Sequence, residues 1–102
     1  MMYQTGHFAT AHASKYLQQL CKHFGHKVDA RYDPREGRVA FAFGPARLMA
    51  SDSDLTVILC APDEAVLPMA RGVIDSHLVT FAFREDFTTM TWAEPTAEAP
   101  VD

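Results

Sequence analysis

The stretch that decides the fold is Lys27–Ala61, with the sequence KVDARYDPREGRVAFAFGPARLMASDSDLTVILCA. Apolar and polar residues alternate along it in short runs, which is the pattern of half-buried β-strands. The four predicted strands cover Lys27–Tyr32, Arg38–Phe43, Ala46–Ser51 and Leu55–Ala61. Turn-forming residues separate them, and such short connections join only antiparallel neighbours, so the sequence predicts a meander of hairpins.

An amphipathic helix is predicted on each side of this stretch. The first begins at Thr10, a favourable N-cap residue, and ends at Gly25. The second runs from about Asp63 to Thr80, and Pro68 near its start predicts an irregular first turn. The apolar faces consist of Ala13, Leu17, Leu20, Cys21 and Phe24 in the first helix, and of Leu67, Ala70, Ile74, Leu78 and Phe81 in the second.

Two further strands complete the prediction, one at Gly6–Ala9 and one at Thr88–Trp92. The result is an α+β fold in the order β-α-β-β-β-β-α-β, a two-layer sandwich with two helices packed on one face of an antiparallel meander sheet. A single domain is expected over residues 1–92. Residues 93–102 consist mainly of Ala, Glu, Pro and Thr, so we expect a disordered tail there.

The sheet face that points away from the helices is less polar than a solvated face. It is predicted to carry Asp29, Arg31, Arg38, Ala40, Ala42, Arg47, Met49, Thr56, Ile58 and Cys60. Apolar residues gathered on such a face indicate a contact with another protein, which makes this face a candidate homodimer contact. The alternative is an ordinary surface with scattered apolar residues.

Composition excludes several classes of function. The net charge of -4 argues against nucleic-acid binding, which depends on clustered Lys and Arg. No apolar run approaches the roughly 20 residues that a membrane span needs, and Met1–Phe8 does not have the pattern of a signal peptide, so a cytoplasmic location is expected. Cys21 and Cys60 lie far apart without a metal or redox motif, and we expect both to be small buried side chains.

Two polar clusters near the ends of the predicted helices are the candidate functional site. The candidate ligand-binding residues are His23, His26, Lys27, His77, Arg84 and Glu85. His77 falls within the apolar stripe of the second helix, so it must be satisfied by a hydrogen bond or serve a function. Structural alternatives are a semi-buried His77 bonded to a backbone carbonyl, and cations near a helix C-terminus that offset its dipole. The spacing fits no metal, phosphate-loop or catalytic motif, so catalytic residues, metal and cofactor are not assigned.

Much of the chain shares short segments with a known bacterial family. These are Thr10, Ala13–Leu17, Leu20–Phe24, His26–Lys27, Gly37, Phe41-x-Phe43-Gly44, Ala61–Asp63, His77–Leu78, Phe81–Glu85 and Trp92. With them the chain resembles the family labelled domain of unknown function 2218, which has no assigned activity. Related domains occur beside, or fused to, siderophore-interacting flavin reductases, so the resemblance implies a link to intracellular iron release by association.

The leading prediction is therefore a small cytoplasmic accessory or ligand-binding domain, without catalysis of its own, that serves iron–siderophore handling. Its expected partners are a siderophore-interacting flavin reductase or an iron–siderophore ligand. The alternative is a metal-binding protein or a small enzyme that uses the His cluster at the helix ends.

Overall fold

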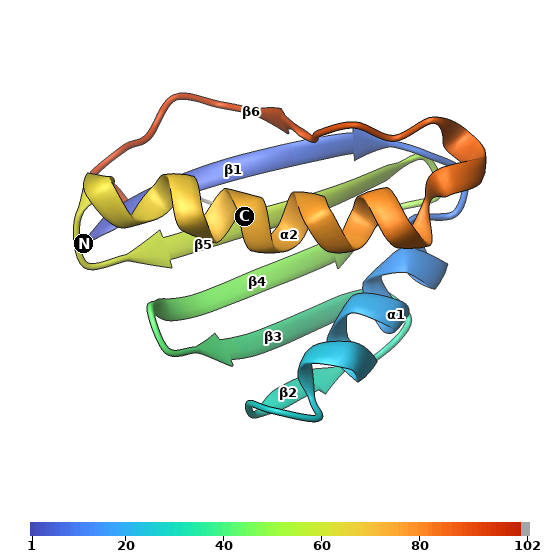
Figure 1. The fold of residues 1–102 in the computed structure, drawn as a ribbon, viewed down its shortest axis with the longest axis horizontal. Helices are drawn as coiled ribbons and strands as arrows, with labels where there is room; N and C mark the ends of the chain where they lie inside the picture. The colour runs from blue at the N-terminus through green and yellow to red at the C-terminus, as the bar shows by residue number, and fades with distance from the viewer. Residues whose placement is uncertain (101–102) are drawn as a thin grey trace.

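The computed structural model describes residues 1–100 as one antiparallel sheet covered on one face by two helices (Figure 1). The strands are β1 (Met2–Ala9), β2 (Ala30–Tyr32), β3 (Glu36–Phe41), β4 (Gly44–Ala50), β5 (Asp54–Ala61) and β6 (Thr91–Trp92). The helices are α1 (Ala13–Phe24) and α2 (Leu67–Phe81), with short 3-10 turns at Glu64–Val66 (η1) and Phe83–Glu85 (η2).

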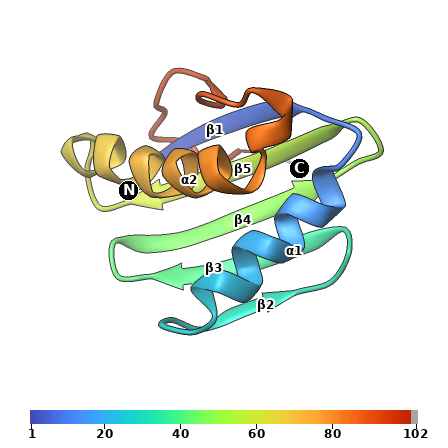
Figure 2. The same ribbon diagram turned by 45° about the vertical axis from the view of Figure 1, so that its right-hand side comes forward.

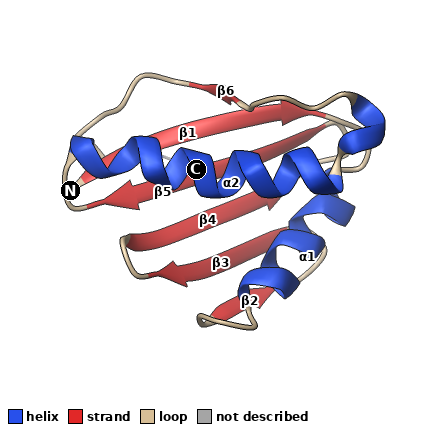
Figure 3. Cartoon of the chain, in the orientation of Figure 1, coloured by secondary structure: helices blue, strands red, loops and turns tan. Residues whose placement is uncertain are grey.

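The strands lie in the order β2-β3-β4-β5-β1-β6. The first four neighbours are consecutive in the chain, which confirms the predicted meander. The N-terminal strand β1 then pairs with β5 on one side and with β6 on the other, both antiparallel. The turned view in Figure 2 shows both helices on the same side of the sheet. Figure 3 distinguishes the helices, in blue, from the strands, in red. The predicted α+β two-layer fold is confirmed.

The predicted apolar faces of both helices form the core. All five core residues of α1 are buried, as are Leu67, Ala70, Ile74 and Leu78 of α2. They pack on alternate residues of β3, β4 and β5, because side chains on one sheet face recur every second residue. Both cysteines are buried and free, as expected.

The hairpin between β3 and β4 differs from the prediction. Phe41 pairs with Gly44, so Ala42 and Phe43 form the turn, which the sequence had placed at Gly44-Pro45. Gly44 has φ +146°, a conformation that residues with a Cβ rarely adopt, and this lets β4 begin there. The sequence does not reveal this turn, because the alternation of Phe and Ala in Phe41–Phe43 continues the strand pattern through the turn residues.

Other element ends also move. The strand expected at Lys27–Tyr32 begins only at Ala30, and the one expected at Thr88–Trp92 is the two-residue β6. The first strand is longer than the predicted Gly6–Ala9. Residues 36 and 37 belong to β3 because the Asp33 carboxylate accepts hydrogen bonds from the amides of Arg35 and Glu36, which completes the preceding turn within two residues.

The predicted start of the second helix is confirmed, whereas that of the first helix differs in the structure. Thr10 is not the N-cap of α1, which begins at Ala13 after His12. The Thr10 hydroxyl instead accepts a hydrogen bond from the His12 amide and donates one to Glu85. The second helix has the predicted irregular start, because η1 precedes it and Pro68 lies in the first turn of α2, where its missing N–H is harmless.

The segment after β6 stays beside β1 for several residues. Tyr3 and Thr96 exchange two backbone hydrogen bonds of 2.7 and 2.9 Å, and the Gln4 side chain donates to the carbonyl of Ala93. For the rest of the predicted tail, after Thr96, disorder stays a prediction. Residues 101–102 of that tail lie outside the described part of the chain. Neither helix in residues 1–100 has the length and apolar content that crossing a membrane requires.

Candidate ligand-binding site

A pair of histidines bridges the two helices. The rings of His23, at the end of α1, and His77, in α2, have centroids 4.7 Å apart. Both were candidate ligand-binding residues in the sequence, and the structure brings them together. The Val73 carbonyl can only accept a hydrogen bond, so the Nδ1–H of His77 donates to it at 2.6 Å. This is the carbonyl-bonded, partly buried histidine expected as the structural alternative.

The histidine pair borders an apolar pocket of about 200 Å³. Phe24 packs edge-on against both Phe41 and His77, with centroid distances of 4.8 and 4.9 Å, and so forms one wall. The full lining consists of His23, Phe24, Lys27, Val28, Phe41, Val73 and His77. We call this lining the histidine pocket. It combines aromatic surface with one cationic side chain, which suits a small planar ligand that carries negative charge.

The end of α1 positions these groups. The helix stops at Gly25, whose amide donates to the carbonyl of Cys21 at 2.9 Å, and the chain turns directly into Lys27 and Val28. Desolvation lowers the pKa of His23, and the nearby charges of His77, His26 and Lys27 lower it further. His23 is therefore neutral at neutral pH, and a bound anion would favour its protonated form.

The structure divides the predicted site residues between two places. His26 is exposed and absent from the pocket lining, although its charge acts on His23. Arg84 is exposed, and its guanidinium lies 5.6 Å from the ring centroid of Phe83. Glu85 lies at the opposite end of α1, so the structure brings His23, Lys27 and His77 together but not Glu85. Glu85 follows directly after α2, and the end of α2 lies beside the beginning of α1 (Figure 1).

Glu85 connects the end of α2 to the start of α1. Its carboxylate accepts hydrogen bonds from the Thr10 hydroxyl at 2.8 Å and from the Tyr16 hydroxyl. Burial raises the pKa of Glu85, but these two hydrogen bonds and the positive charges of His12 and Lys15 outweigh it, so the net shift is downward. Burial, helped by the hydrogen bond and the charge of Glu85, raises the pKa of Tyr16 to about 12.

These shifts predict how stability depends on pH. Because the folded-state pKa of Glu85 is lowered, its stabilising contribution is present above the unfolded pKa and is lost as the pH falls through the folded value. Urea unfolding should therefore show a Glu85→Gln variant less stable than the parent at neutral pH, with the difference shrinking below about pH 4.3. The exposed Glu64 gives a matched control, and Glu64→Gln should leave the loss of stability at acidic pH unchanged. A Glu85→Gln deficit that stays constant into acid would contradict the assignment.

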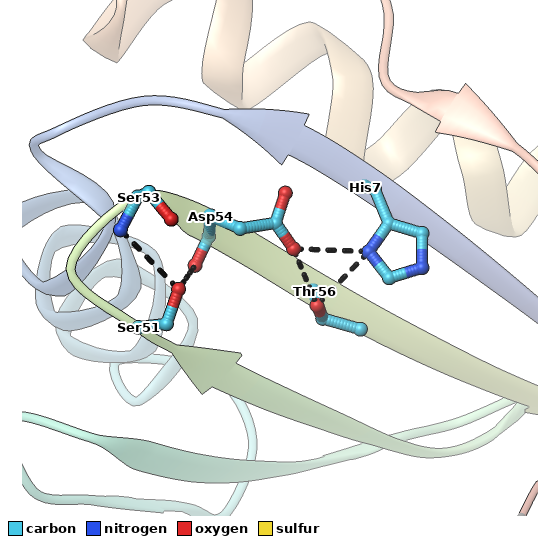
Figure 4. Close-up of polar contacts among 5 residues, drawn as sticks. All are labelled: His7, Ser51, Ser53, Asp54 and Thr56. Atoms are coloured by element: carbon cyan, nitrogen blue, oxygen red, sulfur yellow. Dashed lines mark hydrogen bonds and ion pairs between the residues drawn. The ribbon is translucent and has the colours of Figure 1, made fainter.

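A second polar cluster on the other sheet face was missed by the sequence analysis. Asp54 Oδ2 lies 3.0 Å from both His7 Nδ1 and Thr56 Oγ1, as Figure 4 shows. In the turn before it, the Ser51 hydroxyl donates to the carbonyl of Asp54 and accepts from the Ser53 amide. His7 and Thr56 are register partners on β1 and β5, a pairing that no local pattern reveals. His7 is exposed while Asp54 and Thr56 are partly buried, and the bonds of this cluster fasten the β4–β5 turn to β1.

The described residues offer little for a metal. No group of three or more His, Cys, Asp or Glu side chains within residues 1–100 is placed to hold an ion. One buried side-chain oxygen in the same range, Oε1 of Gln19, has no hydrogen-bond partner. Gln19 precedes His23 by one helical turn on α1.

The fold and the pocket together define a small α+β sandwich with a ligand-sized site between its two helices. The family model described as "Uncharacterized protein conserved in bacteria (DUF2218)" matches residues 5–93, and the chain belongs to this family. Among solved structures, the chain is similar to the NMR structure of PA4090 from Pseudomonas aeruginosa, with 32% identity and a TM-score of 0.76. That alignment covers 97% of this chain and 100% of the other. A comparison with curated proteins gave no match.

Proposed function

We propose that the protein is a small cytoplasmic ligand-binding or accessory domain, without catalysis of its own, whose site is the histidine pocket. The observation that carries the proposal is the pair of histidine rings, 4.7 Å apart, at the border of a pocket walled by phenylalanines. Its volume of about 200 Å³ is of the size that holds one aromatic ring. Lys27 supplies the positive charge that an anionic ring would need, and the two histidine rings offer hydrogen-bonding nitrogens beside it.

Iron–siderophore handling fits this chemistry. A catecholate siderophore presents planar aromatic rings with negatively charged oxygens, and one such ring matches both the aromatic walls and the Lys27 ammonium of the histidine pocket. The link to siderophores itself comes from the family resemblance. The proposed partner protein is a siderophore-interacting flavin reductase, to which the domain would deliver or present the ligand.

Calorimetry with a ferric catecholate siderophore tests this proposal. We expect binding to the parent protein and an affinity at least about tenfold lower for His77→Gln, equivalent to about 1.4 kcal/mol. Glutamine retains a group that can donate to the Val73 carbonyl, so the fold should persist. His7→Gln makes the same change on the other sheet face and should bind like the parent. Equal affinities for the two variants, or no binding by the parent, would contradict the site.

The flavin reductase is tested separately, by adding it to the domain with and without the siderophore. Tighter association in the presence of siderophore supports the accessory role, and identical association in both conditions argues against it.

The alternative function is a metal-binding protein or small enzyme that uses His23, His26 and His77. Metal binding needs three or four ligands in a compact geometry, whereas only His23 and His77 meet in the structure. Metal analysis of protein purified without a His-tag decides between the two functions. Stoichiometric zinc or iron that is lost on His77→Ala would favour this alternative.

A further inference from the structure

Three arginines lie side by side on the sheet face that the helices leave uncovered. Arg31 of β2 is the register partner of Arg38 of β3, and Arg38 is the partner of Arg47 of β4. Residues directly opposite on antiparallel strands have Cβ atoms about 4.5–5.5 Å apart on the same face. The same line of partners continues from Arg47 to Ile58 of β5, which in turn faces Thr5 of β1. We call Arg31, Arg38 and Arg47 the arginine row.

The charge of this row is unusual for the chain that carries it. The protein has a net charge of -4, yet three like charges occupy consecutive opposed positions, which destabilises a sheet. Arg31 has a 3.9 Å contact with Asp29 in which both side chains are exposed, and Arg47 has a partner of its own. Within residues 1–100, the side chain of Arg38, between these two, has no ion pair or hydrogen bond. An anion bound beside Arg38 would relieve the repulsion at the centre of the row, so this position is complementary to a negatively charged ligand.

A hollow beside the row adds apolar surface. It has a volume of about 200 Å³ and lies between Arg38, Arg47 and the β1 residue Tyr3, with Ile58 and Cys60 also contributing. Ile58 and Cys60 are both only 8% exposed although they point away from the helices. A second hollow shares Arg38 and Pro45 with the first and is also lined by Asp29, Arg31 and Ala40. Together they form a shallow groove across the strands that combines guanidinium groups with small apolar side chains.

The chain itself shows what kind of segment fits there. Ala99 and Pro100 line the first hollow, at the end of the segment AEPTAEAP that covers residues 93–100. This segment is acidic, consists largely of alanine and proline, and lies along the sheet by way of the Tyr3–Thr96 bonds. Small apolar residues suit the hollow, and carboxylates suit the neighbouring arginines.

We propose that the groove along the arginine row is a docking site for an acidic, extended, alanine- and proline-rich segment of a partner protein. Residues 99–100 form part of the wall at one end of the groove and are displaced when the partner segment binds. A protein segment is favoured over nucleic acid because the row offers only three cations on an acidic protein, whereas phosphate backbones need a broad basic surface. A second copy of the chain would bring its own arginine row close to this one, which opposes a symmetric pairing through this face.

Fluorescence anisotropy on the full chain tests the proposal. The probe is a labelled peptide that repeats AEPTAEAP twice, and the control probe has glutamine in place of every glutamate. We expect the acidic probe to bind, with an affinity that falls as salt is added, and the control probe to bind much more weakly. Arg38→Gln should lower the affinity for the acidic probe by at least about tenfold. Arg84→Gln removes the same charge from an exposed position near α2 and should change the affinity by less than about twofold.

Other outcomes decide against the docking site. Failure of the acidic probe to bind, equal losses in Arg38→Gln and Arg84→Gln, or tighter binding of a single-stranded oligonucleotide of equal charge would each overturn it. Sedimentation at the same protein concentration identifies a second copy as the occupant, which would also overturn it. In NMR spectra, the Ala99 amide signal should move as the probe binds, and an unchanged signal would contradict displacement. Because Arg38 is exposed and its charge repels its neighbours in the row, unfolding curves should show Arg38→Gln at least as stable as the parent, which separates lost binding from lost fold.

Discussion

A Gly44→Ala substitution is expected to be the most destabilising small change in this protein. Gly44 begins β4 with φ +146°, and a Cβ built on it would lie 2.2 Å from the carbonyl oxygen of Cys60 on the neighbouring strand β5. A methyl group could be admitted only if the backbone of Gly44 changed its conformation and the backbone of Cys60 moved away. Backbone strain costs about 1–3 kcal/mol and overpacking costs another 1–3 kcal/mol, so we expect a loss of about 2–6 kcal/mol.

Urea unfolding measures this loss, and Gly72→Ala provides a matched control in the same chain. A Cβ at Gly72, in α2, would meet no atom within 4 Å. Alanine is also the better helix former by about 1 kcal/mol, so Gly72→Ala should be neutral or stabilising. Equal changes in the free energy of unfolding for the two substitutions would contradict the close approach of β4 to β5 at Gly44.

Asp75→Ala is expected to have the second largest effect, because this carboxylate fastens the C-terminal segment to α2. It accepts hydrogen bonds from the Trp92 indole N–H at 3.0 Å, the Thr89 hydroxyl at 2.6 Å and the Met90 amide at 3.0 Å. Hydrogen bonds to charged groups contribute about 1.5–3 kcal/mol each, and partial exposure reduces that, so we expect a loss of about 2–4 kcal/mol in total.

Trp92 gives this prediction a local readout, because it is the only tryptophan in the chain. Its ring lies against Gly6 of β1, where an added Cβ would come within 2.7 Å of the ring. Without Asp75 the indole should become more exposed, and its fluorescence should shift to longer wavelength. The control is Asp52→Ala, since Asp52 is 96% exposed and its removal should change stability by less than about 0.5 kcal/mol. An unshifted emission in Asp75→Ala would contradict the proposed attachment.

The sequence by itself determined the secondary structure and the core. Apolar periodicity identified both helix faces, and Leu17 and Ile74 are fully buried as expected. The four-strand meander followed from alternation and short turns. Element ends were less well determined, as at Phe43 and Gly44, because alternation cannot distinguish a strand from a two-residue turn that keeps the same pattern. The site was predicted in part, since His77 was recognised as a polar residue within an apolar stripe.

Only the tertiary structure decided which distant residues meet. It placed β1 between β5 and β6, moved Glu85 to the Thr10–Tyr16 end of α1 and left His23 with His77. It also aligned three arginines from three strands. Each of these outcomes depends on strand register or on helix position over the sheet. Those are set by the packing of the whole core, so the local pattern of residue types around any one position does not contain them.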